Sequence, residues 1–238
     1  MDMSTLVILS LVIIVAAFVQ GSVGVGFALI VAPVFSLIEP SLIPVALLII
    51  MLPLNFYVAF RERHGLDKPG LGWITLGRFL GTFLGAWILL AISARSLNIF
   101  VGLSTVLAAL LSLAAPSFKP GRNTLGLAGL VTGVTETATG IGGPPLALVY
   151  QHHPGPVLRS TIAACFLIGE IISLIILAIG GKVNAELMWN SLLLVPAVLI
   201  GGGLSRLVHH RVRGKGLRAG VMVFAIAAGL FLLLKEFF

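Results

Sequence analysis

The sequence predicts an all-α polytopic membrane protein with two inverted-topology repeats, each made of a glycine-broken helical hairpin plus three transmembrane helices. Three observations lead to this prediction. The composition is strongly apolar, the apolar residues gather in spans of membrane-crossing length, and the basic residues gather in loops that would share one side of the bilayer.

The composition excludes a soluble protein. Of 238 residues, 58% are hydrophobic and 10% are charged, and the mean hydropathy is +1.14. Soluble domains carry about 25% charged residues, so eight acids and fifteen bases would not cover the surface of a soluble chain of this length. The same composition excludes a disordered tail, and the single cysteine, Cys165, excludes an internal disulfide.

Apolar spans of about 20 residues cross a bilayer as helices. Two further apolar stretches, 4–38 and 124–150, are too long for one crossing and are broken by glycine near their centres. Each could be a pair of crossing helices or a hairpin that enters and leaves on the same side. No stretch alternates like a strand of an outer-membrane barrel. The six clear spans are 41–60, 71–92, 96–115, 161–180, 187–205 and 217–234.

The basic residues predict the direction of these spans. Eleven of the fifteen lie in four loops, which the excess of positive charge places in the cytoplasm. Stretch 4–38 must then begin and end outside, and stretch 124–150 must begin and end inside. The net charge of +7 therefore reflects topology and not a nucleic-acid-binding face. The four loops are 61–70, 116–123, 151–160 and 206–218.

An internal repeat accompanies this reversal of direction. A shift of 116 residues places Gly24-Val25-Gly26 over Gly140-Ile141-Gly142 and Gln20 over Glu136. The order of spans also matches between the halves. The sequence thus predicts a first transmembrane repeat over 1–115, a cytoplasmic linker over 116–123 and a second repeat over 124–238.

The two broken segments are the expected anion-binding site. In transporters with inverted repeats, interrupted helices from both halves meet near the midplane, and their free N–H groups suit an anion. Hydroxyls before the glycines and prolines after them strengthen the second segment. The alternative is that the glycines only let helices pack closely. The candidate substrate-binding residues are Gln20, Ser22, Gly24 and Gly26, and then Thr137, Thr139, Gly140, Gly142 and Gly143.

Four polar residues lie inside the spans, where charge is costly and usually paired or functional. Arg78 could be the counter-charge of an anionic substrate, or it could snorkel or pair with a glutamate. Glu136 and Glu170 are candidates for proton coupling, with a structural carboxyl as the alternative. Asn55 could line the same cavity or bond another helix. Gly77, Gly81 and Gly85 are expected to be a helix-packing stripe.

No pattern in the sequence predicts an enzyme, a metal site or a cofactor. There is no phosphate-binding loop to power a primary pump, and no serine–histidine–acid or zinc-ligand set at membrane depth. The adjacent His152 and His153 are expected to be surface residues in a cytoplasmic loop.

These motifs resemble those of the TauE/SafE family (sulfite exporter, or 4-toluene sulfonate uptake permease). Gly24-x-Gly26 followed by Ala32-Pro33 resembles the first family signature, and 139–145 with Tyr150 after it is similar to the second. The resemblance covers nearly the whole chain. It implies a multi-pass permease of the bacterial inner membrane, with two homologous halves and with sulfite, sulfonates or related small organic anions as substrates.

The resulting hypothesis is a secondary transporter that moves a small sulfur-containing anion by alternating access and could couple this movement to protons. Its expected partners are the anion and the lipid bilayer. Export is the expected direction because an inside-negative potential drives anions outward. Two alternatives stay open: a passive small-anion channel with the same pore, and a membrane scaffold that transports nothing.

Overall fold

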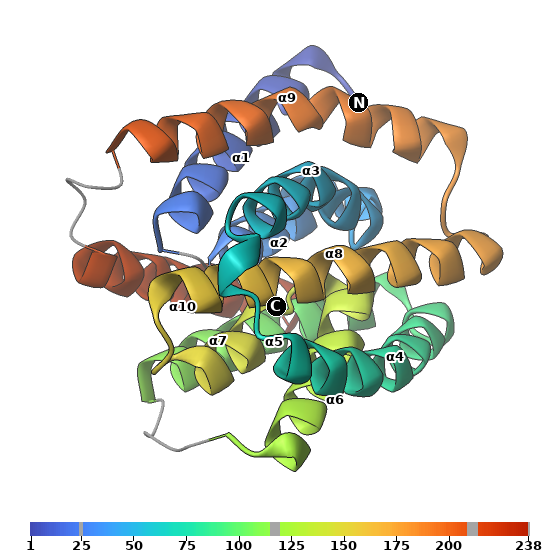
Figure 1. Ribbon diagram of the computed structural model, residues 1–238. Coiled ribbons are helices and arrows are strands. Elements are labelled where there is room, and N and C mark those ends of the chain that lie inside the picture. Colours follow the sequence, from blue (N-terminus) through green and yellow to red (C-terminus); the bar gives the residue numbers. More distant parts are fainter. Residues whose placement is uncertain (24–25, 115–119, 209–213, 238) are drawn as a thin grey trace.

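The computed structural model describes residues 1–23, 26–114, 120–208 and 214–237, and within these ranges it contains helices and no strands (Figure 1). Two short 3₁₀ helices, Pro40–Leu42 and Arg63–Gly65, flank the third α-helix. The α-helices are α1 Met3–Val23, α2 Phe27–Ile38, α3 Val45–Arg61, α4 Lys68–Ala91, α5 Ala94–Ala114, α6 Arg122–Thr139, α7 Gly143–Tyr150, α8 Gly155–Ile179, α9 Ala185–Val208 and α10 Gly214–Phe237.

Six of these helices, α1, α4, α5, α8, α9 and α10, are long and apolar enough to cross a bilayer. Five of them match expected spans. The expected span 41–60 forms a shorter helix of 17 residues, α3, which begins only at Val45. Pro40 starts a 3₁₀ turn, and Ile43, the residue before Pro44, is extended, because proline disfavours helical backbone in the residue that precedes it.

The surface of the bundle is apolar in the way that a lipid environment requires. Trp87 on α4 is 68% exposed and Ile179 at the end of α8 is 83% exposed. Large apolar side chains on this scale would be unfavourable in water, but they match the hydrocarbon of a bilayer. The all-helical bundle therefore has the architecture of a multi-pass membrane protein.

Both glycine-broken stretches are helical hairpins with a break where the glycines lie. In the second, α6 ends at Gly140, whose φ of +80° is a left-handed conformation that favours glycine, and α7 starts at Gly143. In the first, α2 follows Gly26, which has a φ of +123°. Gly24 and Val25 lie outside the described residues.

Glycines on α4 allow this helix to pack closely against α6. A side chain at Gly77, Gly81 or Gly85 would meet the backbone of α6 at Gly126, Leu130 and Val134, respectively. The contact positions rise together along both helices, so α4 and α6 run side by side in the same direction. The expected role of this stripe in helix packing is confirmed.

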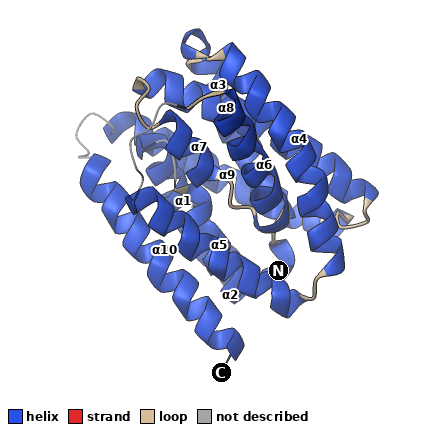
Figure 2. Cartoon of the chain, turned by 90° about the horizontal axis from the view of Figure 1, so that it is seen from below, coloured by secondary structure: helices blue, strands red, loops and turns tan. Residues whose placement is uncertain are grey.

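Three other helix pairs also pack closely, and each joins a helix of residues 1–115 to one of residues 124–238. Helices α1 and α9 also run in the same direction, with Gly201 against Ile14 and Gly21 against Ser205. Helices α5 and α10 pack antiparallel, and so do α3 and α8. Figure 1 shows α1 with α9 at the top and α4 with α6 at the bottom, and Figure 2 shows the long helices from below.

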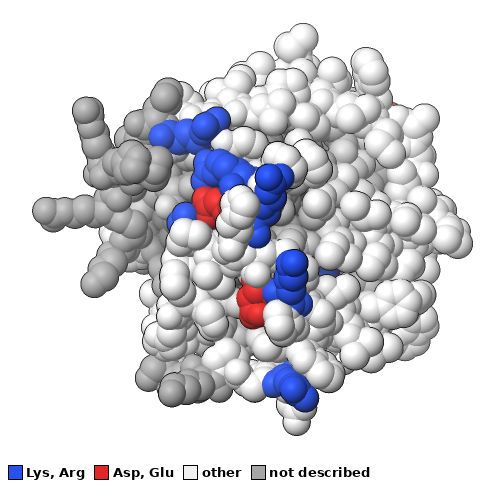
Figure 3. All heavy atoms as spheres, viewed as in Figure 1, with Lys and Arg blue, Asp and Glu red and all other residues white. Residues whose placement is uncertain are grey.

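The basic side chains on the face drawn in Figure 3 lie mainly on its left half. In Figure 1, this is the side where α8 begins. Arg61 at the end of α3, Lys68 at the start of α4 and Arg159 near the start of α8 come from two of the expected cytoplasmic loops, 61–70 and 151–160. This agrees with the direction that the positive-inside bias predicts for the helices.

Candidate functional site

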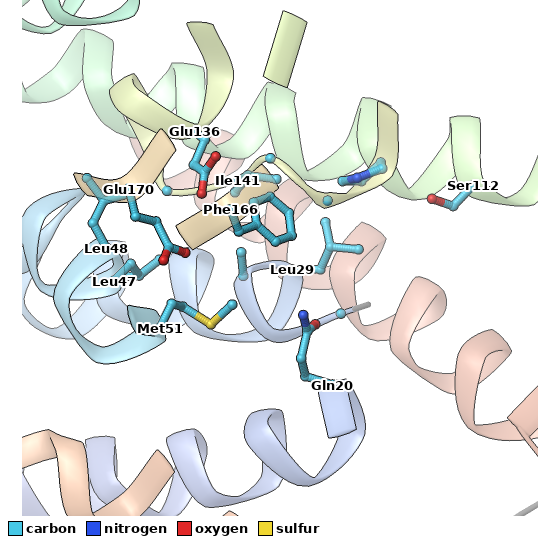
Figure 4. Close-up of a pocket in the computed structure, with 16 residues that line it drawn as sticks. Gln20, Leu29, Leu47, Leu48, Met51, Ser112, Glu136, Ile141, Phe166 and Glu170 are labelled. Carbon is cyan, nitrogen blue, oxygen red and sulfur yellow. The ribbon is translucent and has the colours of Figure 1, made fainter. Parts of the chain in front are cut away.

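A cavity lies where the two broken segments face each other. It is lined by Gln20, Gly26, Ala28 and Leu29 from the first segment, and by Glu136 and 140–144 from the second. Helices α3 and α8 close its sides (Figure 4). Its open space is about 30 Å³, which holds one or two water molecules.

Two helices begin at this cavity, α2 after Gly26 and α7 at Gly143. The first N–H groups of a helix have no partner within that helix, and they carry partial positive charge. Gln20 Oε1 accepts a hydrogen bond of 3.1 Å from one of these groups, Phe27 N. At Gly143 the backbone is accessible, since a Cβ there would meet nothing within 4 Å.

Two buried carboxyl groups, Glu136 on α6 and Glu170 on α8, also line the cavity. Figure 4 shows both pointing toward the space beside the Phe166 ring, with Gln20 on the opposite side. Asn55 Nδ2 on α3 donates a hydrogen bond of 2.7 Å to Oε1 of Glu170. Oε2 of Glu170 has no hydrogen-bond partner among the described residues.

Arg78 lies behind these carboxyl groups and is 1% exposed. Its guanidinium forms an ion pair with Glu136 and stands over the Phe166 ring, with Cζ 5.4 Å from the centroid. Gly169 makes room for it, because a Cβ there would collide with Nε. Arg78 is not on the cavity lining, so the arrangement corresponds to the expected alternative of a pair with a glutamate.

The predicted hydroxyl residues stand behind the lining. Thr139 Oγ1 accepts a hydrogen bond from Ile141 N at 3.2 Å and donates one to Thr135 O at 2.7 Å. It therefore caps the break between α6 and α7. Thr137 bonds Ser173 on α8 at 2.8 Å, and Ser22 donates to Phe18 O in its own helix.

The structure thus brings five of the predicted substrate-binding residues to the cavity and leaves five of them off its lining. Gly24 is outside the described residues. The lining residues are Gln20, Gly26, Gly140, Gly142 and Gly143, together with both proton-coupling candidates; those off the lining are Ser22, Asn55, Arg78, Thr137 and Thr139.

Several lining residues were missing from the predicted site, and most of them are apolar. Phe166 precedes Glu170 by four residues, and Met51 precedes Asn55 by four. Residues four apart share a helix face, so helical spacing from the predicted polar residues would have found them. The others are Ala28, Leu29, Leu47, Leu48, Ser112, Ile141 and Pro144.

A multi-pass helical bundle whose interrupted helices meet at a cavity beside buried ionisable groups has the architecture of a membrane transporter. The family model described as sulfite exporter TauE/SafE matches residues 9–232, and the chain belongs to this family. Sulfite-exporter-type transport is what membership in this family implies. Among curated proteins and among solved structures, nothing matches the chain.

Proposed function

We propose that the protein is a secondary transporter that exports a small sulfur-containing oxyanion, such as sulfite or a sulfonate, across the bacterial inner membrane. The observation that carries this proposal is the shared cavity, because residues of both broken segments line it. Irregular backbone inside a membrane protein is tolerated where it is buried or lines a polar path.

We further propose that 1–115 and 124–238 are inverted repeats joined by the linker 116–123, of which residues 116–119 are outside the described part. The packing supports this. The pair α4 with α6 has its counterpart in α9 with α1, and both run parallel. Each of α3 and α5 packs antiparallel on its own counterpart, α8 and α10, as a two-fold axis in the membrane plane would require.

The proposed binding residues fall into two groups. Gln20, Gly26, Gly140, Gly142 and Gly143 hold the anion through backbone N–H groups and one amide. Hydroxyls and amides behind them position the breaks: Thr139 caps one, Thr137 ties it to α8, Ser22 bonds the helix before the other, and Asn55 holds Glu170. Gly24 is proposed to extend the first group.

The charges beside the cavity support coupling to protons. Glu136 and Glu170 present two carboxyl groups, and Arg78 supplies one guanidinium. With both carboxyls ionised, one negative charge would stay uncompensated in the membrane interior and would oppose an anion. A proton on Glu170, whose Oε2 has no hydrogen-bond partner among the described residues, removes that charge when the anion binds.

The cavity must widen during transport. Its present volume holds one or two water molecules, which is too little for a sulfonate. We interpret the structure as a closed intermediate of an alternating-access cycle. The inside-negative potential favours outward movement by about 2.3 kcal/mol per net negative charge per 100 mV, so it favours export of an anion that carries more charge than the proton bound with it.

Flux into proteoliposomes tests the proposal. Radiolabelled sulfite or methanesulfonate should move with saturable kinetics and should respond to an imposed proton gradient, while protein-free liposomes show neither. Flux that rises linearly with concentration and ignores the gradient would instead indicate the channel alternative. Absence of flux above protein-free liposomes for all the anions tested would overturn the transport proposal and favour a scaffold.

A further inference from the structure

A second cavity lies next to the central one, near the end where α3 and α9 finish and α8 begins. Gln20 lines both cavities. Asn55 lines the second and bonds Glu170 in the first. The second cavity therefore stands between the central cavity and the end of the bundle that the basic loops assign to the cytoplasm.

Three arginines from three helices line this second cavity, which we call the arginine pocket: Arg61 on α3, Arg159 on α8 and Arg206 on α9. The Cζ atoms of Arg61 and Arg206 each lie 5.3 Å from the centroid of the Tyr57 ring. Two of the three guanidinium groups thus contact the Tyr57 ring.

One carboxylate, Glu62, joins two of these arginines. Its Oε1 lies 2.5 Å from Arg61 Nη2, and its Oε2 lies 3.0 Å from Arg159 Nε. Both arginines are about one third exposed, while Glu62 is 11% exposed. The carboxylate is therefore the more enclosed partner, with the guanidinium groups reaching past it to the cavity.

The charges of this cluster do not balance. Two guanidinium groups, those of Arg61 and Arg159, share the single carboxylate of Glu62, and no Asp or Glu lines the cavity among the described residues. Like charges held together are unfavourable unless an anion neutralises them. Planar guanidinium groups suit two oxygens of one oxyanion at a time, so the chemistry fits a sulfonate, sulfite or similar group.

We propose that the arginine pocket is a separate binding site for a small oxyanion at the cytoplasmic mouth. Its open space is about 30 Å³, as in the central cavity, so the anion binds by displacing Glu62, the internal counter-ion, from between the arginines. The role of the pocket as the entry to the central cavity depends on the proposed transport function. Anion binding in the pocket does not, and it can be measured without any flux.

The test uses a thiol placed in the pocket. Val58 lines it and is partly buried, so Val58→Cys with Cys165→Ala gives a single reactive cysteine. The rate of labelling is compared for two methanethiosulfonate reagents, one carrying a sulfonate and one a trimethylammonium group, each corrected for its rate with a free thiol. We expect the sulfonate reagent to react about tenfold faster or more, the lower range of electrostatic focusing in a charged cleft.

Substitutions in the pocket should change that ratio. Arg159→Gln and Arg206→Gln, on different helices, should each bring it toward one, while Glu62→Gln should raise it. Arg122→Gln is the matched control, because Arg122 stands over Trp73 outside the pocket and its loss should leave the ratio unchanged. A ratio near one in the parent, or one that the two pocket variants leave unchanged, would overturn the proposal.

Competition identifies the source of the anion. Methanesulfonate should slow labelling of the parent in lipid-free detergent, and Glu62→Gln should lower the concentration that gives half protection. If only added phosphatidylglycerol protects, the pocket binds lipid headgroups and the proposed site for a soluble anion is wrong. If the pocket is labelled as expected but no transport is measured, the anion site is supported and only the transport proposal is overturned.

Discussion

Asn55 on α3 donates a hydrogen bond to Glu170 on α8, and the bond lies between the two cavities of the molecule. Glu170 lines the central cavity, and Asn55 lines the arginine pocket. The bond also joins two helices that we propose to be equivalent in the two repeats. A change of charge on Glu170 would thus act directly on the contact between the two halves.

Removing the carboxyl charge at this bond tests proton coupling. Glu170→Gln keeps the size of the side chain and an oxygen that can accept from Asn55, but it cannot ionise. We expect saturable anion flux that no longer responds to a proton gradient in proteoliposomes. Glu186→Gln, an exposed change at the start of α9, is the control and should keep the response. A normal gradient response in Glu170→Gln would remove this residue from the coupling mechanism.

The ion pair between Arg78 and Glu136 predicts a non-additive effect on stability. Arg78→Met leaves a buried carboxyl without its partner, and breaking a buried pair costs about 3–5 kcal/mol. We expect a large fall in Tm in detergent for the single variant. Adding Glu136→Gln should recover much of the loss, because the unpaired charge is gone. If the fall in Tm of the double variant equals the sum of the falls in the two single variants, Arg78 and Glu136 are not energetically coupled.

Adjacent glycines at the start of α7 offer a matched comparison. At Gly142 an added Cβ would lie 2.8 Å from Oε2 of Glu136, whereas at Gly143 it would meet nothing within 4 Å. Gly142→Ala should therefore displace Glu136 and destabilise the protein by about 1–3 kcal/mol, the usual cost of overpacking. Gly143→Ala should keep the parental Tm. Thermal unfolding in one detergent measures both, and equal Tm values would contradict the described geometry.

The glycine stripe of α4 should tolerate no larger residue. Gly81→Val places side-chain atoms where the backbone of α6 lies, so we expect a lower Tm and poor yield of folded protein. Gly72→Val on the same helix faces open space and serves as the control. Similar yields and Tm values for the two variants would mean that α4 and α6 are not in the close contact described.

Two substitutions of Thr139, which caps the second break, distinguish a positioning role from simple packing. Thr139→Val keeps the shape but loses the oxygen that accepts from Ile141 N, and this should raise KM for the transported anion. Thr139→Ser keeps the hydroxyl and should restore KM toward the parental value. If both variants transport like the parent, Thr139 has no part in shaping the site.

The apolar composition and the loop charges were enough to predict the class of fold, and the glycines were enough to predict where two stretches break. The family motifs lie at these breaks as well. The roles of the polar side chains behind the cavity lining were harder to predict, because a hydroxyl beside a glycine can face a ligand or cap its own helix. Thr139 does the second, and only its hydrogen bonds to Thr135 and Ile141 show this.

The sequence by itself determined that this chain crosses a membrane many times and which two segments are interrupted, and it predicted in which direction the helices run. These features depend on local hydropathy, charge and backbone freedom, which neighbouring residues in the chain decide. Only the tertiary structure decided that Arg78 pairs with Glu136, that Asn55 holds Glu170, and that three arginines share one pocket. Those residues lie 47 to 145 positions apart in the chain, and their geometry comes from helix packing that no local pattern encodes.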